Sequence, residues 1–415
     1  MKVLIVDLSA KAGVSLGGGA RVAGSLFNGL KKYGISTYYL GYKNQYIKVS
    51  KNVFILEGGK IKPQAAARKV LHKLRLNGIA ESNLGRIAYY SAYSLTGVST
   101  EGAEHWVETI KPDIILASSI QDYVVLKRMK KHLSNAKLVY IEHANASGEY
   151  RSAFDYNIIP LTFGTGTYKG LHGAQERFFS FFDGVIALNK EQAERIRRLN
   201  ENVVVIHSSV LMEDVKVNPT KLKRFKEKLG ISKDTKTVLY LGRLSEAQKN
   251  VSTLIIAFKA IKDDRFKLMI VGEGRSIHLY EQMSEGDGRI LVQGRVPEQE
   301  LPYYYSIADL YVLPSLWESF NATMIEAAHF GSGLLLSRLA INSDIIEKFG
   351  KRLYIFDPYD AGELRSKIIR YFSDANLRKK LKEVSKEISR EYTKEKQIKS
   401  YADSLKNMHM HGKLQ

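Results

Sequence analysis

Two glutamates, Glu318 and Glu326, stand eight positions apart in the segment WESFNATMIE of residues 317–326. If all eight steps are helical, their backbones lie about 12 Å apart along the helix axis. A carboxylate accepts two hydrogen bonds at once and suits paired hydroxyls on a sugar ring. The spacing therefore predicts two carboxylates at opposite ends of a nucleotide sugar, with a helix N-terminus facing its diphosphate. Two arbitrary glutamates at this spacing are usually solvated surface acids, so the surrounding motifs must decide.

Two cations occur in one loop, GRLSEAQKN of residues 242–250, which begins with Gly242. The guanidinium of Arg243 binds oxygen anions in a bidentate manner, and the ammonium of Lys249 is a compact point charge. Together they suit a diphosphate leaving group, because neutralising that group lowers the cost of breaking its bond to a sugar carbon. The alternative is an ordinary basic surface loop.

Other small or polar residues follow apolar runs that are typical of strands. The glycine loop at residues 13–19, which contains Gly17, Gly18 and Gly19, follows the first run and opens a helix. Such a loop lets the backbone approach a phosphate, although its spacing is not that of a dinucleotide-binding motif. His143 follows the run at 138–141 and can donate to a sugar hydroxyl, with a structural role as the alternative. Gly272 and Val296 follow two later runs and favour main-chain contact with a nucleobase.

The apolar runs themselves form two series. The first series occupies 3–6, 37–40, 53–56, 114–117, 138–141, 185–188 and 203–206, and the second occupies 238–241, 268–271, 290–292, 310–313 and 333–336. Short, fully apolar strands between helices are typical of parallel sheets covered on both faces. We therefore expect an α/β protein with a doubly wound domain at 1–207, a linker at 208–234 and a second doubly wound domain at 235–380, facing a central cleft.

Length and composition agree with this organisation. A chain of 415 residues suits two domains, and it contains no cysteine for a disulfide or thiolate metal site. No run of eighteen apolar residues predicts a transmembrane helix, and the N-terminus resembles a first strand rather than a signal peptide. These features predict a cytoplasmic protein.

The positive charge is concentrated near the N-terminus. The chain carries a formal net charge of +20, and residues 1–80 contain fourteen Lys and Arg against Asp7 and Glu57. Such a domain attracts nucleic acid, an anionic membrane or a phosphorylated acceptor. The basic amphipathic stretch at 63–76 suits a membrane interface, or packing against its own domain.

Taken together, the motifs resemble those of GT-B glycosyltransferases of family 4, which are retaining, nucleotide-sugar-dependent and metal-independent. The resemblance is strongest over 236–345 and includes LMIVGEG, the two glutamates and the segment that precedes them. It is looser in the first half, where it includes the glycine loop, His143 and FFDGVIALNKEQAERI. Asn321 departs from the family pattern, which usually has glycine at this position.

The resemblance implies specific roles. Glu318 contacts the donor sugar and Glu326 the ribose, while Arg243 and Lys249 hold the diphosphate and His143 lies against the transferred sugar. Backbone from Ser319, Phe320, Asn321 and Ala322 assists at the diphosphate, and the glycine loop lies near the phosphates or the acceptor. A C-terminal helix over 381–415 is expected to cross back to the first domain.

The leading hypothesis is a glycosyltransferase that moves a hexose from a UDP- or GDP-sugar to a glycan or lipid-linked acceptor, peripherally at the cytoplasmic membrane face. No metal, other cofactor or nucleic-acid partner is expected. A second hypothesis is a soluble synthase of a small sugar, polymer or sugar phosphate. A third is a nucleic-acid-binding or nucleic-acid-modifying protein, which the net charge permits although no nucleic-acid-binding motif is visible.

Overall fold

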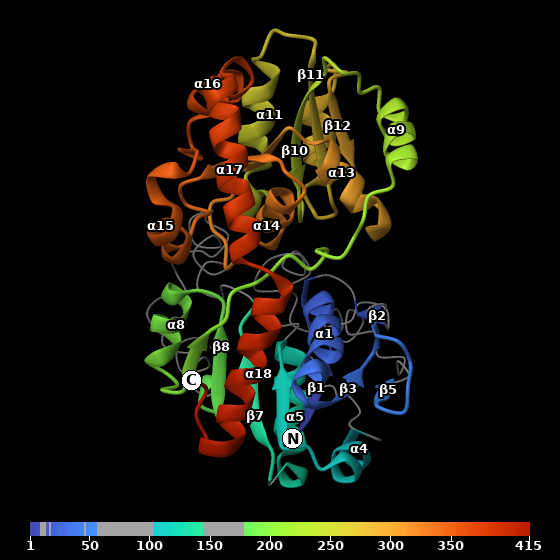
Figure 1. Cartoon of the computed structure of the whole chain (residues 1–415), viewed down its shortest axis with the longest axis vertical. Helices are drawn as coiled ribbons and strands as arrows, with labels where there is room; N and C mark the ends of the chain where they lie inside the picture. Colours follow the sequence, from blue (N-terminus) through green and yellow to red (C-terminus); the bar gives the residue numbers. More distant parts are fainter. Residues whose placement is uncertain (9–13, 16–17, 45–46, 56–102, 134, 144–177) are drawn as a thin grey trace, which may run out of the picture. The chain divides into compact units, whose positions relative to one another are not determined.

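The chain folds into two compact units, each built on a parallel β-sheet (Figure 1). The computed structural model describes residues 1–8, 14–15, 18–44, 47–55, 103–133, 135–143 and 178–415. Unit 1 comprises Met1–Ile206 together with Ile398–Gln415, and unit 2 comprises His207–Gln397. The amphipathic stretch at 63–76 lies outside the described residues.

Unit 1 contains a seven-stranded sheet in the order β5-β3-β1-β6-β7-β8-β9. Its strands are β1 (Lys2–Asp7), β3 (Ser36–Gly41), β5 (Val53–Ile55), β6 (Ile114–Ala117), β7 (Lys137–Ile141), β8 (Gly184–Ala187) and β9 (Val203–Val205). All neighbouring strands are parallel, and β2 (Val14–Ser15) pairs separately with β4 (Lys43–Asn44). The strand order changes direction between β1 and β6, which is the position where open α/β sheets bind ligands.

The helices of unit 1 alternate with these strands. They are α1 (Gly18–Gly29), α4 (Ala103–Ile110), α5 (Ile120–Arg128) and α8 (Lys190–Arg197), with short 3₁₀ turns at Leu30–Tyr33 and Lys130–His132. Helix α5 begins with a capping box in which the Ser119 and Asp122 side chains each bond to the other's backbone N–H. The C-terminal residues belong to this unit, since Leu414 N donates to Asn202 Oδ1 at 2.8 Å.

Unit 2 contains a six-stranded parallel sheet in the order β12-β11-β10-β13-β14-β15. Its strands are β10 (Lys236–Leu241), β11 (Phe266–Val271), β12 (Ile290–Gln293), β13 (Leu310–Leu313), β14 (Gly333–Ser337) and β15 (Ile355–Phe356). Here the strand order changes direction between β10 and β13. The central strands are almost fully buried because helices cover the sheet.

The first helix of unit 2 lies within residues 208–234, the segment expected to be a linker. The helices of this unit are α9 (Pro219–Lys228), α10 (Glu246–Lys249), α11 (Val251–Lys259), α12 (Ile277–Ser284), α13 (Leu301–Ile307), α14 (Ala322–His329), α15 (Ser343–Phe349), α16 (Ala361–Ser373) and α17 (Ala375–Glu391), with 3₁₀ turns at Glu298–Glu300 and Gly350–Arg352. Helix α18 (Lys394–His411) starts in unit 2, and its residues from Ile398 onwards belong to unit 1. Helices α11 and α16 contribute Leu254, Phe258 and Ile368 to the core with the strands. The range 381–415 comprises the end of α17 followed by α18, rather than one helix.

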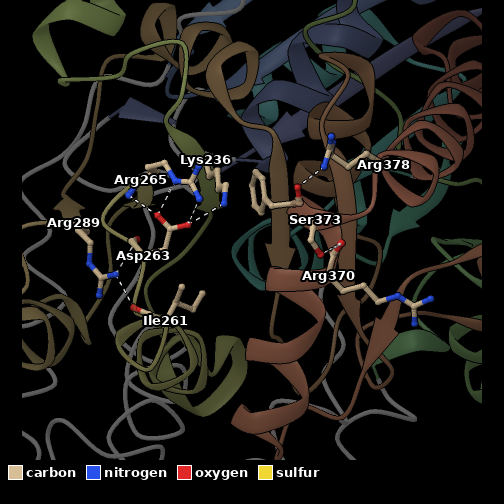
Figure 2. Close-up of polar contacts among 9 residues, drawn as sticks. Lys236, Ile261, Asp263, Arg265, Arg289, Arg370, Ser373 and Arg378 are labelled. Carbon is tan, nitrogen blue, oxygen red and sulfur yellow. Dashed lines mark hydrogen bonds and ion pairs between the residues drawn. The ribbon is translucent and has the colours of Figure 1, made fainter.

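An ionic network holds the amino-terminal ends of the strands in unit 2. Asp263 accepts a hydrogen bond from Lys236 Nζ at 3.0 Å and another from Arg265 Nη2 at 2.8 Å (Figure 2). Hydrogen bonds from these two donors, of which the bond from Arg265 has the larger effect, hold the pKa of Asp263 well below its usual range. Arg289 Nη1 donates to the backbone oxygen of Ile261 at 2.7 Å (Figure 2). This end of the sheet is thus tied by structural contacts, whereas the predicted site residues follow the opposite ends of the strands.

The expected architecture is confirmed: both units are parallel sheets interleaved with helices, and within the described residues each predicted apolar run overlaps a strand. None of the described helices is long and apolar enough to cross a membrane.

Candidate functional site

The candidate site of unit 2 lies where β10 and β13 end. These strands are neighbours in the sheet, and the chain leaves them towards opposite edges. Two loops consequently begin side by side, the β10 loop of residues 242–250 and the β13 loop of residues 314–321. A crevice at this kind of position is the usual ligand site of an open α/β sheet.

Hydrogen bonds join the two loops directly. Leu316 N donates to the backbone oxygen of Gln248 at 2.8 Å, and Gln248 Nε2 donates to the backbone oxygen of Trp317 at 3.3 Å. Asn250 has a left-handed backbone, which Asn tolerates better than most residues, and its Nδ2 donates to Pro314 O at 3.3 Å. The positions of the β10 and β13 loops are therefore mutually fixed.

An ion pair crosses between these loops. Lys249 Nζ, at the end of the single-turn helix α10, donates to Glu318 Oε1. The two side chains are only 12% and 8% exposed. Arg243 lies earlier in the same β10 loop and is exposed, which leaves its guanidinium accessible. The structure thus brings a predicted sugar-binding carboxylate into contact with a predicted phosphate-binding cation.

The pKa values of two buried tyrosines on the neighbouring strands depend on the charges around them. Burial raises the pKa of Tyr311 on β13, and the nearby carboxylates of Glu318 and Glu326 raise it further. Burial likewise raises the pKa of Tyr240 on β10, with Glu318 raising it and Arg243 lowering it. Both glutamates and the arginine therefore lie within electrostatic reach of the same pair of strand ends.

Glu326 is in the second turn of α14 and is 1% exposed. Its Oε2 accepts from Tyr305 Oη on α13 at 2.9 Å. Helix α14 starts only at Ala322, so the steps from Glu318 to Ala322 are not helical and the helical spacing of about 12 Å does not apply to the whole span. Contact of Glu326 with a ribose remains a prediction, and a ligand would have to reach a carboxylate that a tyrosine already binds.

The glycines at the other strand ends serve close backbone packing. Gly272, just after β11, has φ +147°, and a Cβ there would lie 1.8 Å from the backbone oxygen of Gly242. Because only glycine fits, the β10 loop and the loop after β11 approach each other more closely than side chains allow. Val296 is half-buried after β12. Nucleobase contact by Gly272 and Val296, and nucleotide-sugar binding by Gly242, stay predictions.

The β13 loop concentrates buried polar atoms without protein partners. Within the described residues, Ser315 Oγ, Trp317 Nε1 and Asn321 Nδ2 are buried and have no hydrogen-bond partner. Buried polar groups are normally hydrogen-bonded, so three such atoms in seven residues need partners that the described residues do not supply. Ser319 and Phe320 are also buried.

In unit 1 the predicted residues lie at the corresponding position of the other sheet. His143 follows β7, and Gly19 is in the first turn of α1. Both line a small cavity of about 10 Å³ together with Ser118, which follows β6. That volume is close to the space needed by one water molecule. Gly18 is the first residue of α1, and Gly17 lies outside the described residues.

His143 is held in its neutral form. Its Nε2 is buried and finds no acceptor or donor in the part of the chain that the structure describes. Burial lowers the pKa of His143 to about 4, while the negative charge of Asp7 opposes this shift. A neutral imidazole can donate one hydrogen bond and accept one, which suits a hydroxyl-bearing ligand or a water molecule.

Sequence reasoning missed the tyrosines of this site. Tyr240, Tyr305 and Tyr311 are fully buried with their hydroxyls bonded to the loops or to Glu326. A tyrosine within an otherwise apolar strand was the available signal, because its hydroxyl must find a polar partner when buried.

Comparison with known proteins agrees with this description. Residues 222–388 match the family model for glycosyl transferases group 1. Alpha-monoglucosyldiacylglycerol synthase of Streptococcus pneumoniae is 26% identical over 183 residues, which are 42% of this chain and 41% of that protein. The chain spans about half the length of the curated relatives it matches.

Solved structures resemble the whole chain. Sucrose-phosphate synthase from Thermosynechococcus elongatus has a TM-score of 0.70 at 18% identity, covering 98% of each chain. Anabaena HepE in complex with UDP-glucose has a TM-score of 0.66 at 16% identity, covering 98% of this chain and 100% of that chain. The two parallel-sheet units therefore define a GT-B fold. Residues 222–388, about two fifths of the chain, match the glycosyl transferases group 1 family.

Proposed function

We propose that this protein is a retaining glycosyltransferase that moves a hexose from a UDP- or GDP-sugar to an acceptor hydroxyl. The observation that carries this proposal is the gathering of Arg243, Lys249 and Glu318 at the ends of β10 and β13. The family of the domain at 222–388 supports the same chemistry.

In the proposed reaction the bond between the anomeric carbon and the leaving phosphate oxygen breaks. The acceptor oxygen bonds to the same carbon from the same face, and its proton passes to the leaving phosphate. Arg243 and Lys249 offset the negative charge that develops on that phosphate, a role assigned to these side chains rather than to a metal ion. Glu318 orients the sugar through its hydroxyls once Lys249 turns towards the diphosphate.

The proposed acceptor is a glycan or lipid-linked intermediate at the cytoplasmic face of a membrane. Residues 1–80 carry a net charge of +12, and each Lys or Arg near an anionic leaflet contributes about 1 kcal/mol. The relative from Streptococcus pneumoniae is named for a glycolipid product. Vesicles containing anionic lipid at low salt should bind the protein. Transfer to soluble sugars or sugar phosphates with no vesicle binding would contradict this choice of acceptor.

The donor is tested by thermal-shift measurement with UDP, GDP, ADP and their sugars, because a ligand that binds only the folded state raises the Tm. One nucleotide series should stabilise the protein. Lys249→Ala should weaken binding of the free nucleotide, whereas Glu318→Gln should reduce turnover more than nucleotide affinity. If no nucleotide or nucleotide sugar shifts the Tm, the proposed function is wrong.

A further inference from the structure

The side chain of Asn321, in the β13 loop, has a fixed orientation. As the N-cap of α14, its Oδ1 accepts from Met324 N at 3.2 Å and from Thr323 Oγ1 at 2.7 Å. Rotating the amide by half a turn would put Nδ2 against the N–H of Met324, which is also a donor. The two capping bonds therefore determine which amide atom is Oδ1.

The opposite end of the amide, Nδ2, carries two N–H donors and is buried. Asn321 is 6% exposed, and Nδ2 meets no hydrogen-bond acceptor among the residues described. A buried amide nitrogen without an acceptor is costly, so a position that keeps one is expected to meet an acceptor in the bound state. Glycine at this position would need no such acceptor.

A chain of polar contacts connects Asn321 to the end of β10. Thr323 Oγ1, which donates to Asn321 Oδ1, lies 2.7 Å from Tyr311 Oη, and Tyr311 Oη also lies 3.2 Å from the backbone oxygen of Leu241. Asn321 is three residues beyond Glu318 in the same β13 loop. Its donor is thus anchored to the two strands that carry the candidate site, rather than to a remote surface.

We propose that Asn321 is a specificity-determining residue whose Nδ2 donates to a hydroxyl oxygen of the hexosyl group of the donor substrate. This inference rests on the proposed function and adds the residue that distinguishes one hexose from another. A phosphate oxygen is the other acceptor that a nucleotide sugar offers. Sites that hydrogen-bond a substrate hydroxyl discriminate strongly against analogues that lack it, because the protein group is then left unpaired.

Two substitutions remove the amide donor but retain a helix cap. Asn321→Ser caps α14 with a hydroxyl and carries no charge, and Asn321→Asp retains the carboxyl oxygen where Oδ1 lies. Asn321→Ser should keep the Tm within a few degrees of that of the wild type, whereas Asn321→Asp should lower it, because a charged oxygen would replace the buried Nδ2. Asn321→Gly removes the cap as well and reports separately on helix stability.

The contact of Asn321 with the hexosyl group is tested by measuring affinities for UDP and UDP-glucose. GDP and GDP-mannose replace them if that series stabilises the wild type. Asn321→Ser should bind the nucleotide sugar about tenfold more weakly and the free nucleotide within about twofold of the wild type. Equal losses for both ligands would place the acceptor on the nucleotide, and unchanged affinities would mean that no acceptor exists. Either result overturns the inference while wild-type binding still upholds the proposed function.

Deoxy forms of the sugar identify the hydroxyl. Among the 3-, 4- and 6-deoxy forms, the one that lacks the hydroxyl bound by Asn321 should bind the wild type about tenfold more weakly than the parent nucleotide sugar. Asn321→Ser should bind that same analogue and the parent equally well, because the partner of the missing hydroxyl is gone. If Asn321→Ser discriminates among the deoxy forms as the wild type does, the assigned contact is wrong.

Discussion

Lys249 and Glu318 are 69 positions apart in the chain, yet Lys249 Nζ donates directly to Glu318 Oε1 across the β10 and β13 loops. Each charge is therefore neutralised in the free protein by a residue with a different predicted role. Donor binding would exchange this ion pair for a lysine–phosphate contact and a carboxylate–hydroxyl contact. The pair keeps both groups largely buried in the free protein, and on donor binding Lys249 turns from Glu318 to the phosphate.

The energy of this pair can be measured with a double-mutant cycle of Lys249→Met and Glu318→Gln. Each single variant leaves one largely buried charged group without its partner and should lower the free energy of unfolding by about 3 kcal/mol. The double variant should lose clearly less than the sum of the two, with a coupling of at least about 1 kcal/mol in urea denaturation.

The exposed pair of Lys394 and Asp214, whose side chains are 33% and 84% exposed, is the matched control. Its cycle, with Lys394→Met and Asp214→Asn, should give a coupling below about 0.5 kcal/mol. Equal coupling energies in the two cycles would contradict the view that burial makes the Lys249–Glu318 contact significant.

A second prediction concerns Gly272, whose backbone contacts that of Gly242. Gly272→Ala should lower the free energy of unfolding by about 3 kcal/mol, because the new Cβ would meet a backbone oxygen and the φ of +147° is unfavourable for alanine. Gly288→Ala is the control, since a Cβ there has open space, and it should change stability by less than about 0.5 kcal/mol. Similar stability of the two variants would show that the two loops can separate easily.

The strands, and the charged residues and glycines that follow them, could be predicted from the sequence, because apolar runs and loop motifs are local signals. The runs at 238–241 and 310–313 became β10 and β13, and the cations and Glu318 follow them as expected. Parallel strands align their carboxyl ends, so proximity of these residues also followed from the pattern. No local sequence pattern indicated that β10 and β13 are neighbours in the sheet.

The pairings depended on that strand order and on side-chain packing, and local patterns could not provide them. Contact between Lys249 and Glu318 requires β10 beside β13 in a specific register. The burial of Glu326 against Tyr305 depends on which face of α14 meets α13. Spacing along one helix predicts the separation of two residues but not whether a carboxylate faces solvent, ligand or core.

The contact of Tyr305 with Glu326 gives a third prediction. Tyr305→Phe removes a donor to a buried carboxylate and should lower the free energy of unfolding by about 2 kcal/mol. Nucleotide-induced stabilisation should change as well if Glu326 reaches the ribose. Tyr303→Phe, at a half-buried tyrosine two positions earlier, is the control and should have an effect below about 0.5 kcal/mol. A Tyr305→Phe variant as stable as the control would mean that the phenol is dispensable to Glu326.

The burial of His143 predicts a pH dependence of stability in acid. Its pKa is about 4 in the folded state and about 6.5 in an unfolded chain, so between these values the unfolded state binds a proton that the folded state does not. Stability is therefore lost as pH falls from 6.5 towards 4, by about 2 kcal/mol at pH 5 and almost nothing at pH 7.5.

His143→Gln removes this titration but keeps a hydrogen-bonding side chain. Relative to the wild type, its free energy of unfolding should rise by about 2 kcal/mol between pH 7.5 and pH 5 in urea denaturation. Parallel pH profiles for wild type and His143→Gln would mean that His143 takes up its proton in the folded state. In that case the residue could act as a cation towards a phosphate, whereas a neutral imidazole at pH 7 fits a hydroxyl or a bound water.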